Sequence, residues 1–185
     1  MPSDSTRRGR DVASNRDPAG PSRRLRRSYE AGHTPKFLVL VDDTLDCDKA
    51  VYYASRRAAR VGAKLALLRI IDSPYPAVAW LGVAEVMHTE ARREAQQLLD
   101  TYVSCAESVA GISPETIICE GEPAQEIFKL IAADEDIAVL VLAAGSTNKG
   151  PGPLVADLAR TAGSYPIPVV IVPAHLTDAE LHALS

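Results

Sequence analysis

Residues 137–144 read IAVLVLAA, and this uninterrupted apolar run is the feature that most constrains the fold of the chain. A strand that is apolar on both faces is typical of a parallel sheet, because helices cover both sides of such a sheet. A loop rich in glycine and proline follows, and Pro153 then stands where a helix prefers its first residue. The stretch therefore predicts a buried strand, a loop and a helix N-terminus that suits an anion.

The remaining periodicities predict strands that alternate with helices. Apolar runs predict strands at 37–41, 64–72, 116–120 and 168–172, and helical spacing predicts helices at 46–60, 83–109, 124–134 and 153–162. Alternation implies parallel strands joined by right-handed crossovers. We therefore predict an α/β fold, a Rossmann-like, doubly wound sheet of five parallel strands in the order 3-2-1-4-5 with helices on both faces. In that order the first and fourth strands end side by side, so Asp42 and Gly145 should face each other across a crevice.

Composition divides the chain into three parts. Residues 1–34 hold eight arginines against four acidic side chains and few large apolar ones, so we expect a disordered, arginine-rich tail. Residues 35–174 are predicted to form one α/β domain, and 175–185 a C-terminal tail. The net charge of −4 leaves −8 on the residues after 34, which argues against nucleic-acid binding by the folded domain. No apolar run reaches the roughly 18–20 residues that cross a bilayer, so no membrane partner is expected.

The residue types of catalytic and metal sites show no telling pattern. The three cysteines lie far apart without a CxxC spacing, which predicts free thiols in a cytoplasmic protein. The histidines have no metal-ligand spacing and no nucleophile–base pair is apparent, so we assign no catalytic and no metal-binding residue. An enzyme, such as a nucleotide hydrolase, is the least favoured hypothesis.

Two phosphate-handling motifs lack residues that they require. A P-loop needs a lysine directly after its second glycine, and here Pro151 follows Gly150. A phosphoacceptor receiver domain would begin with a strand ending in paired acids, as VLVDD does. It also needs an aspartate at the end of the third strand and a lysine after the fifth, where this chain has Cys119-Glu120 and Val172-Pro173.

Five segments in order carry a family resemblance: VDDT, KLALLRIID, EGEPAQEI, LVLAAGS and PIPVVIVP. From Lys36 to Pro173 the sequence resembles the universal stress protein family. The resemblance implies a Rossmann-like domain that is usually a homodimer. It also implies, for one branch of the family, ATP held by an acidic residue after the first strand and by a loop G-x₂-G-x₉-G-[ST] after the fourth.

This sequence matches the ATP-binding pattern of the family at some positions and departs from it at others. Asp42 matches the acidic residue, the backbone around Ile70-Ile71 matches the segment near adenine, and Gly145 matches the first loop glycine. The second glycine is replaced by Asn148, and the last Gly-Ser pair falls on Leu158-Ala159, so the loop is altered. Gly163 is better interpreted as a helix C-cap. The candidate nucleotide-binding residues are Asp42, Asp43, Thr44, Ile70, Ile71, Gly145, Ser146, Thr147, Asn148, Lys149, Gly150, Gly152 and Leu154.

On physical grounds, a phosphate could either bind at this loop or be repelled from it. Ser146, Thr147 and Lys149 supply donors, and Gly150 and Gly152 permit close backbone approach. Acidic residues on the facing edge would repel a triphosphate unless Mg²⁺ bridges the charges. The alternative interpretation of those acids is helix capping, by Asp43, Thr44 and Asp46.

Two functional hypotheses therefore remain. The first is a homodimeric stress-response module that senses an adenine nucleotide, ATP with Mg²⁺. The second is an interaction module of the same fold that has lost the nucleotide. In either case we expect the homodimer to form through the last strand, at Val169, Val170, Ile171 and Val172, because an exposed edge strand needs covering.

Overall fold

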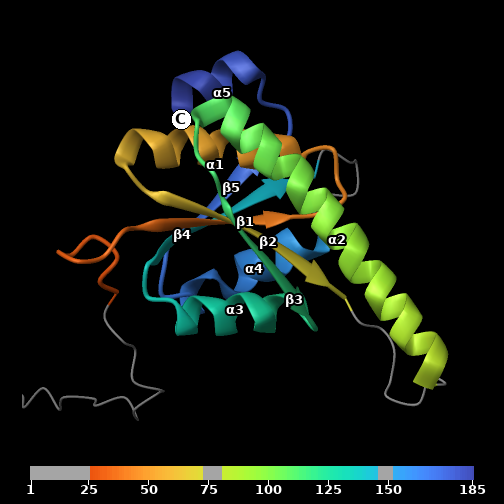
Figure 1. Ribbon diagram of the computed structural model, residues 1–185. Helices are drawn as coiled ribbons and strands as arrows, with labels where there is room; N and C mark the ends of the chain where they lie inside the picture. The colour runs from red at the N-terminus through yellow and green to blue at the C-terminus, as the bar shows by residue number, and fades with distance from the viewer. Residues whose placement is uncertain (1–25, 73–80, 146–151) are drawn as a thin grey trace, which may run out of the picture.

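The computed structural model describes residues 26–72, 81–145 and 152–185, which form a five-stranded parallel sheet between two layers of helices (Figure 1). The elements follow in the order β1 (Lys36–Val41), α1 (Cys47–Val61), β2 (Lys64–Ile71), α2 (Leu81–Ala110), β3 (Glu115–Glu120), α3 (Pro123–Ala133), β4 (Ile137–Ala144), α4 (Pro153–Thr161), a 3₁₀ turn (Ala162–Ser164), β5 (Val169–Pro173) and α5 (Asp178–Leu184).

The strand order is β3-β2-β1-β4-β5, which confirms the predicted doubly wound topology. β1 lies at the centre and pairs in parallel with β2 on one side and with β4 on the other. Because parallel strands end at the same edge of the sheet, the residues after β1 and after β4 become neighbours there. β4 has the bounds that its apolar run predicts, and it is flanked by strands on both sides.

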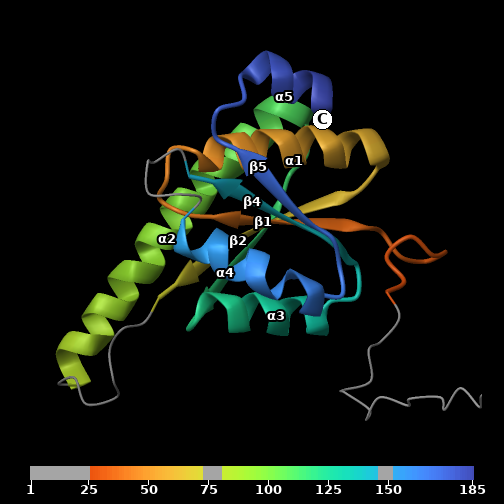
Figure 2. The ribbon, with the colours of Figure 1, turned by 180° about the vertical axis from the view of Figure 1, so that it is seen from behind.

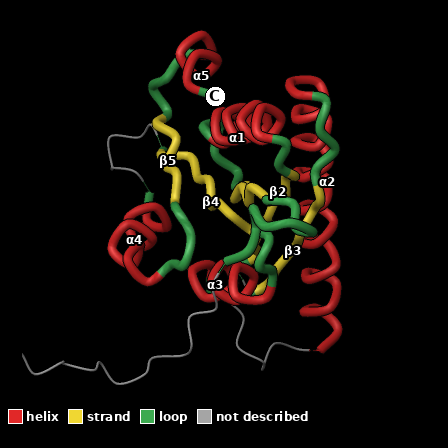
Figure 3. Tube along the Cα trace, turned by 90° about the vertical axis from the view of Figure 1, so that its left-hand side faces the viewer, coloured by secondary structure: helices red, strands yellow, loops and turns green. Residues whose placement is uncertain are grey.

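Two apolar cores, one on each face of the sheet, explain why the central strands are apolar throughout. Phe37, Val39 and Val41 belong to the core that α1, α2 and α5 cover, whereas Leu38 and Leu40 belong to the core under α3 and α4. Figures 2 and 3 show these two helical layers on opposite sides of the sheet. Successive side chains of β1 thus point into different cores, so both faces of the strand are apolar.

Helix α1 shows how local sequence sets an element. Its buried residues recur at helical spacing, and its C-terminus is closed by Gly62 with φ 67°, as the sequence predicts. For Asp46, the alternative interpretation as a side-chain cap does not hold, because Asp46 occupies the N-cap position without making a side-chain cap hydrogen bond. The buried face consists of Cys47, Ala50, Val51, Ala54, Ser55 and Ala58.

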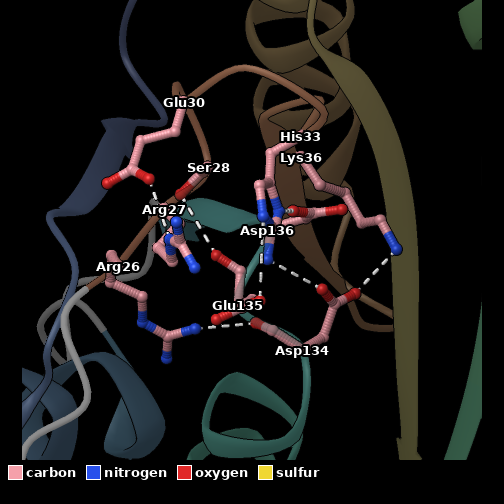
Figure 4. Close-up of polar contacts among 9 residues, drawn as sticks. All are labelled: Arg26, Arg27, Ser28, Glu30, His33, Lys36, Asp134, Glu135 and Asp136. Atoms are coloured by element: carbon pink, nitrogen blue, oxygen red, sulfur yellow. Dashed lines mark hydrogen bonds and ion pairs between the residues drawn. The ribbon is translucent and has the colours of Figure 1, made fainter.

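The last part of the predicted tail, residues 26–34, packs against the turn between α3 and β4 (Figure 4). Ser28 is 4% exposed and donates to the carbonyl of Glu135 at 3.2 Å. Arg26 donates to the carbonyl of Asp134 at 2.7 Å, and His33 Nδ1 lies 2.6 Å from Asp136 Oδ1. The composition of this segment does not reveal these contacts, because they come from polar donors that bind the carbonyls at the end of a helix and not from large apolar side chains. Residues 1–25 lie outside the described part of the chain.

The C-terminal segment also differs in detail from the prediction. Within the predicted tail 175–185, α5 starts with a capping box between Thr177 and Glu180 and buries Leu181 on the core that α1 covers. Gly163 lies in a 3₁₀ turn and does not have the positive φ of the predicted C-cap. None of the helices in the described ranges is long and apolar enough to cross a membrane.

Candidate functional site

A cleft of about 870 Å³ lies at the carboxyl edge of the sheet, where β1 and β4 end. Asp42 and Gly145 both line it, so the predicted crevice is present. Its volume falls in the range typical of small-molecule sites, and strand ends at a topological switch point are the usual ligand position in such sheets. The apolar part of the lining includes Leu40, Ile70, Ile71, Ala95, Leu142 and Val155.

The loop between β1 and α1 is held by a short-range turn. Asp42 Oδ1 accepts hydrogen bonds from the amide of Thr44 at 2.9 Å and from the Thr44 hydroxyl. Such a turn resembles a backbone turn, and its hydrogen bonds fix the direction of the Asp42 carboxylate. Asp42, Asp43 and Thr44 all line the cleft, which is where the sequence places them.

Arg69 is a site residue that sequence reasoning missed. It stands on β2 and its side chain is 20% exposed. Its guanidinium donates from Nη2 to Asp43 Oδ2 at 2.5 Å and from Nη1 to the carbonyl of Val41 at 3.4 Å. Nε is buried without a hydrogen-bond partner among the described residues. A charged residue near the end of an otherwise apolar strand was the available signal.

The end of β2 contributes backbone to the cleft. Ile70 and Ile71 line it, as predicted, and the Ile71 carbonyl accepts a hydrogen bond from the amide of Gly121 at 3.1 Å. Their side chains are at most partly exposed, so a ligand beside them would meet apolar surface and strand backbone. Whether adenine lies here stays a prediction.

Helix α2 forms a wall of the cleft that the sequence did not predict. Ala91, Glu94 and Ala95 line the cleft from this helix. Next to Ala91, Arg92 donates to Glu120 at the end of β3 at 2.5 Å, and His88, one turn earlier, contacts the other oxygen of the same carboxylate. The hydrogen bond from His88 lowers the pKa of Glu120. This ion cluster fastens the wall to the sheet edge.

The opposite wall begins after β4. Gly145 lines the cleft, and Gly152, with φ 93°, lines it again just before α4. The Gly152 carbonyl accepts the first helical hydrogen bond, from the amide of Ala156 at 3.0 Å, so α4 starts at Pro153 as predicted. Leu154 lies in this first turn. Ser146, Thr147, Asn148, Lys149 and Gly150 lie outside the described residues, so their predicted roles stay predictions.

Thiols and metal-ligating side chains offer no further centre among the described residues. Cys47, Cys105 and Cys119 are free thiols, as predicted, and burial raises the pKa of Cys47 to about 11, which disfavours the reactive thiolate. Within ranges 26–72, 81–145 and 152–185, no group of three or more His, Cys, Asp and Glu side chains is arranged to hold a metal ion.

Comparison with known proteins bears on this site. The description "Universal stress protein family" belongs to the family model that matches residues 34–173. No curated protein matches the chain. Solved structures match with probability 1.00, among them universal stress protein UspA from Lactobacillus plantarum, with 22% identity and a TM-score of 0.64 over 75% of this chain and 97% of that one.

Two further similar structures are named with a ligand. A universal stress protein from Archaeoglobus fulgidus in complex with dAMP has 20% identity and a TM-score of 0.52, covering 76% of this chain and 98% of that one. A family protein from Arabidopsis thaliana with AMP bound has 20% identity and a TM-score of 0.53, covering 75% and 91%. At these identities the likeness shows a shared fold.

Proposed function

Because the chain belongs to the universal stress protein family, we propose that it is a stress-response protein whose cleft between Asp42 and Gly145 binds an adenine nucleotide. The observation that carries the proposal is the cleft itself, which lies at the switch point between β1 and β4. Similar structures that are described as complexes with dAMP and AMP support the ligand class.

Each wall of the cleft would contact a different part of the nucleotide. The base would lie beside Ile70 and Ile71, where apolar side chains and strand backbone meet a flat ring. The Asp42 carboxylate would accept hydrogen bonds from ribose hydroxyls, since a carboxylate is an acceptor only. The phosphate would lie by Gly145 and the N-terminus of α4, where the helix dipole favours negative charge.

Equilibrium dialysis with labelled AMP and ATP, with and without Mg²⁺, tests this function. Asp42→Asn is the most informative variant, because asparagine keeps the acceptor for the Thr44 amide and removes the charge. Asp42→Ala removes both. We expect both variants to weaken binding at least about tenfold, whereas Asp100→Asn, on the exposed side of α2, should bind like the parent protein. Absence of binding at millimolar nucleotide would refute the proposal.

The second candidate function is a dimeric interaction module, favoured by the position of β5. This strand pairs with β4 on one side and is the last strand of the described sheet. Val169 and Val170 are half-buried, Ile171 is 37% exposed, and Val172 is buried. We propose that a second copy covers this edge, because an open edge with apolar side chains otherwise invites aggregation.

Sedimentation of the parent chain and of Ile171→Lys tests the assembly. The charge should turn a dimer into a monomer, and His182→Lys on α5 serves as the control for added charge. A monomer over the whole concentration range would contradict the dimer. The cytoplasmic location and the use of Mg²⁺ stay predictions.

A further inference from the structure

Two hydrogen bonds from Arg69 bracket Asp42, the aspartate that the proposed function assigns to the ribose. Nη1 donates to the carbonyl of Val41, the residue before Asp42, at 3.4 Å, and Nη2 donates to Oδ2 of Asp43, the residue after it, at 2.5 Å. A guanidinium presents its N–H groups in a planar, rigid fork, so one side chain holds both neighbours at a set separation. The two contacts therefore restrain the chain on either side of Asp42.

The loop that Arg69 contacts begins where the backbone pairing of β1 ends. β1 pairs with β4 up to Val39 and with β2 up to Val41, which stands opposite Arg69. Helix α1 begins at Cys47, so residues 42–46 connect the last paired residue of β1 to the first residue of the helix. The guanidinium thus reaches the loop at its first residues and ties them to β2.

The two ends of this tie differ in how firmly they are held. Arg69 stands within β2, between Val41 of β1 and Ile118 of β3, and its side chain is only 20% exposed. The side chain of Asp43 is 76% exposed and belongs to the loop. The sheet therefore fixes the guanidinium, and the guanidinium in turn restrains the more exposed loop.

Arg69 also directly precedes the residues beside which the proposed function places the base. Ile70 and Ile71 line the same cleft as Asp42. The Asp42–Thr44 turn sets the direction of the carboxylate within the loop, but the position of the whole loop relative to β2 depends on contacts between the loop and the strand. The hydrogen bonds from Arg69 are such contacts.

We infer, on the basis of the proposed function, that Arg69 is a positioning residue for nucleotide binding. It holds residues 41–43 so that the Asp42 carboxylate reaches the ribose of a ligand whose base lies beside Ile70 and Ile71. Arg69 acts through the loop and needs no contact with the ligand. Without it, the loop occupies its binding position for a smaller fraction of the time, and the apparent Kd rises as the reciprocal of that fraction.

Three variants separate this geometric role from the charge of the cleft. Arg69→Lys keeps the positive charge but replaces the fork with a single compact ammonium, and it should weaken AMP binding about fivefold. Asp43→Ala should also weaken it, by about threefold, although the lining becomes less negative and charge alone would strengthen the binding of an anion. Asp43→Asn removes the same charge but keeps an acceptor for Nη2, so it should stay within about twofold of the parent protein.

Calorimetric titration with AMP measures the affinity, and hydrogen exchange in the nucleotide-free protein measures the loop. The amides of residues 42–46 should be less protected in Arg69→Lys and in Asp43→Ala than in the parent protein, without any ligand present. Arg57→Lys on α1 and Asp100→Ala on α2, two exposed positions outside the cleft lining, are the matched controls and should change neither quantity.

The outcomes distinguish this inference from the proposed function. Parent-like AMP affinity in Arg69→Lys, or tighter binding in Asp43→Ala, would overturn the positioning role and leave nucleotide binding intact. Weaker binding with unchanged protection of the loop would also overturn it, because Arg69 would then act on the ligand itself. Failure of the parent protein to bind AMP would overturn the proposed function and, with it, this inference.

Discussion

Arg69 on β2 donates a hydrogen bond to Asp43 of the β1–α1 loop, with 2.5 Å between Nη2 and Oδ2, and so joins two neighbouring strand ends across the rim of the cleft. The guanidinium is mostly buried and its Nε lacks a partner among the described residues, whereas Asp43 is largely exposed. The pair therefore contributes little to stability, whereas Arg69 supplies the positive charge of the described cleft lining.

Replacing Arg69 separates these two effects. Arg69→Met removes an exposed ion pair, which contributes about 0–1 kcal/mol, and also a buried unpaired donor, whose presence costs about 1–3 kcal/mol. We expect the free energy of unfolding in urea to stay within about 1 kcal/mol of the parent value or to rise. Binding of AMP should weaken severalfold, since the lining gains net negative charge. Arg57→Met, an exposed arginine of α1, is the charge-matched control and should not alter AMP binding. A loss of stability of several kcal/mol would contradict this view of the pair.

The α2 wall should depend on Glu120. Glu120→Gln weakens the hydrogen bonds with His88 and Arg92, so the amides of residues 85–95 should exchange about fivefold faster, equivalent to about 1 kcal/mol. Glu90→Gln is the matched control, because Glu90 pairs with Arg93 within the helix and does not reach the sheet. Hydrogen exchange by mass spectrometry makes the comparison. Equal acceleration in the two variants would show that the cluster does not fasten the wall.

The same cluster predicts a pH dependence of α2. The hydrogen bond from His88 lowers the pKa of Glu120 below the usual 4.5. A lowered folded-state pKa means that the contact stabilises the protein fully above the unfolded pKa and is lost as the pH falls through the folded value. Protection of residues 85–95 should therefore persist above about pH 4.5 and decline below it. Protection that falls between pH 7 and 5 would contradict the assignment.

At the opposite end of the sheet, the stability of the fold should depend on Asp134. Burial would raise the pKa of this carboxyl, but hydrogen bonds from Lys36 at 2.7 Å and from the Asp136 amide at 2.9 Å lower it below 3.8. Asp134→Asn should destabilise the protein by about 1–2 kcal/mol at pH 7, because Lys36 is only 13% exposed and loses its more buried partner.

The cost of Asp134→Asn should also depend on pH. Since the folded-state pKa is lowered, the difference between variant and parent should be constant above about pH 4 and shrink as the pH falls further. Urea unfolding at pH 7 and pH 3 measures it. Asp157→Asn, which breaks an exposed pair with Arg160, should cost less than about 0.5 kcal/mol at either pH. Equal costs for the two variants would contradict the prediction.

The three thiols should differ in reactivity. Burial raises the pKa of Cys47 to about 11 and the side chain is fully covered, whereas Cys105 and Cys119 are half-buried. In the native protein a disulfide reagent should modify Cys105 and Cys119 first, and Cys47 only when the protein unfolds. When the reaction is followed over time, Cys47 should give the slow phase, so Cys47→Ala should remove that phase and leave the reaction of Cys105 and Cys119 unchanged. A Cys47 that reacts with the other two in the native state would contradict its buried position.

The central strands could be predicted closely from sequence because their signal is local. The run of residues 137–144 is apolar at every position, and only a strand covered on both faces requires this. The alternation of strands and helices then limits the strand order, which brings Asp42 and Gly145 together. That part of the site follows from topology and needs no side-chain detail.

The remaining parts of the site depend on contacts that sequence spacing does not encode. Arg69 and Glu94 reach the cleft because a strand end and a long helix meet over one edge of the sheet. The loop before α1 likewise contains a turn between Asp42 and Thr44 and no side-chain cap hydrogen bond from Asp46. Ser28 is buried through a hydrogen bond to a carbonyl more than a hundred residues away in sequence.

A crystal structure of the chain grown with saturating AMP tests the central claim most directly. The account predicts electron density for the nucleotide in the cleft, with its base beside Ile70 and Ile71 and its ribose within hydrogen-bonding distance of the Asp42 carboxylate. A cleft that holds only solvent at saturating AMP, or a nucleotide bound on another surface, would contradict it.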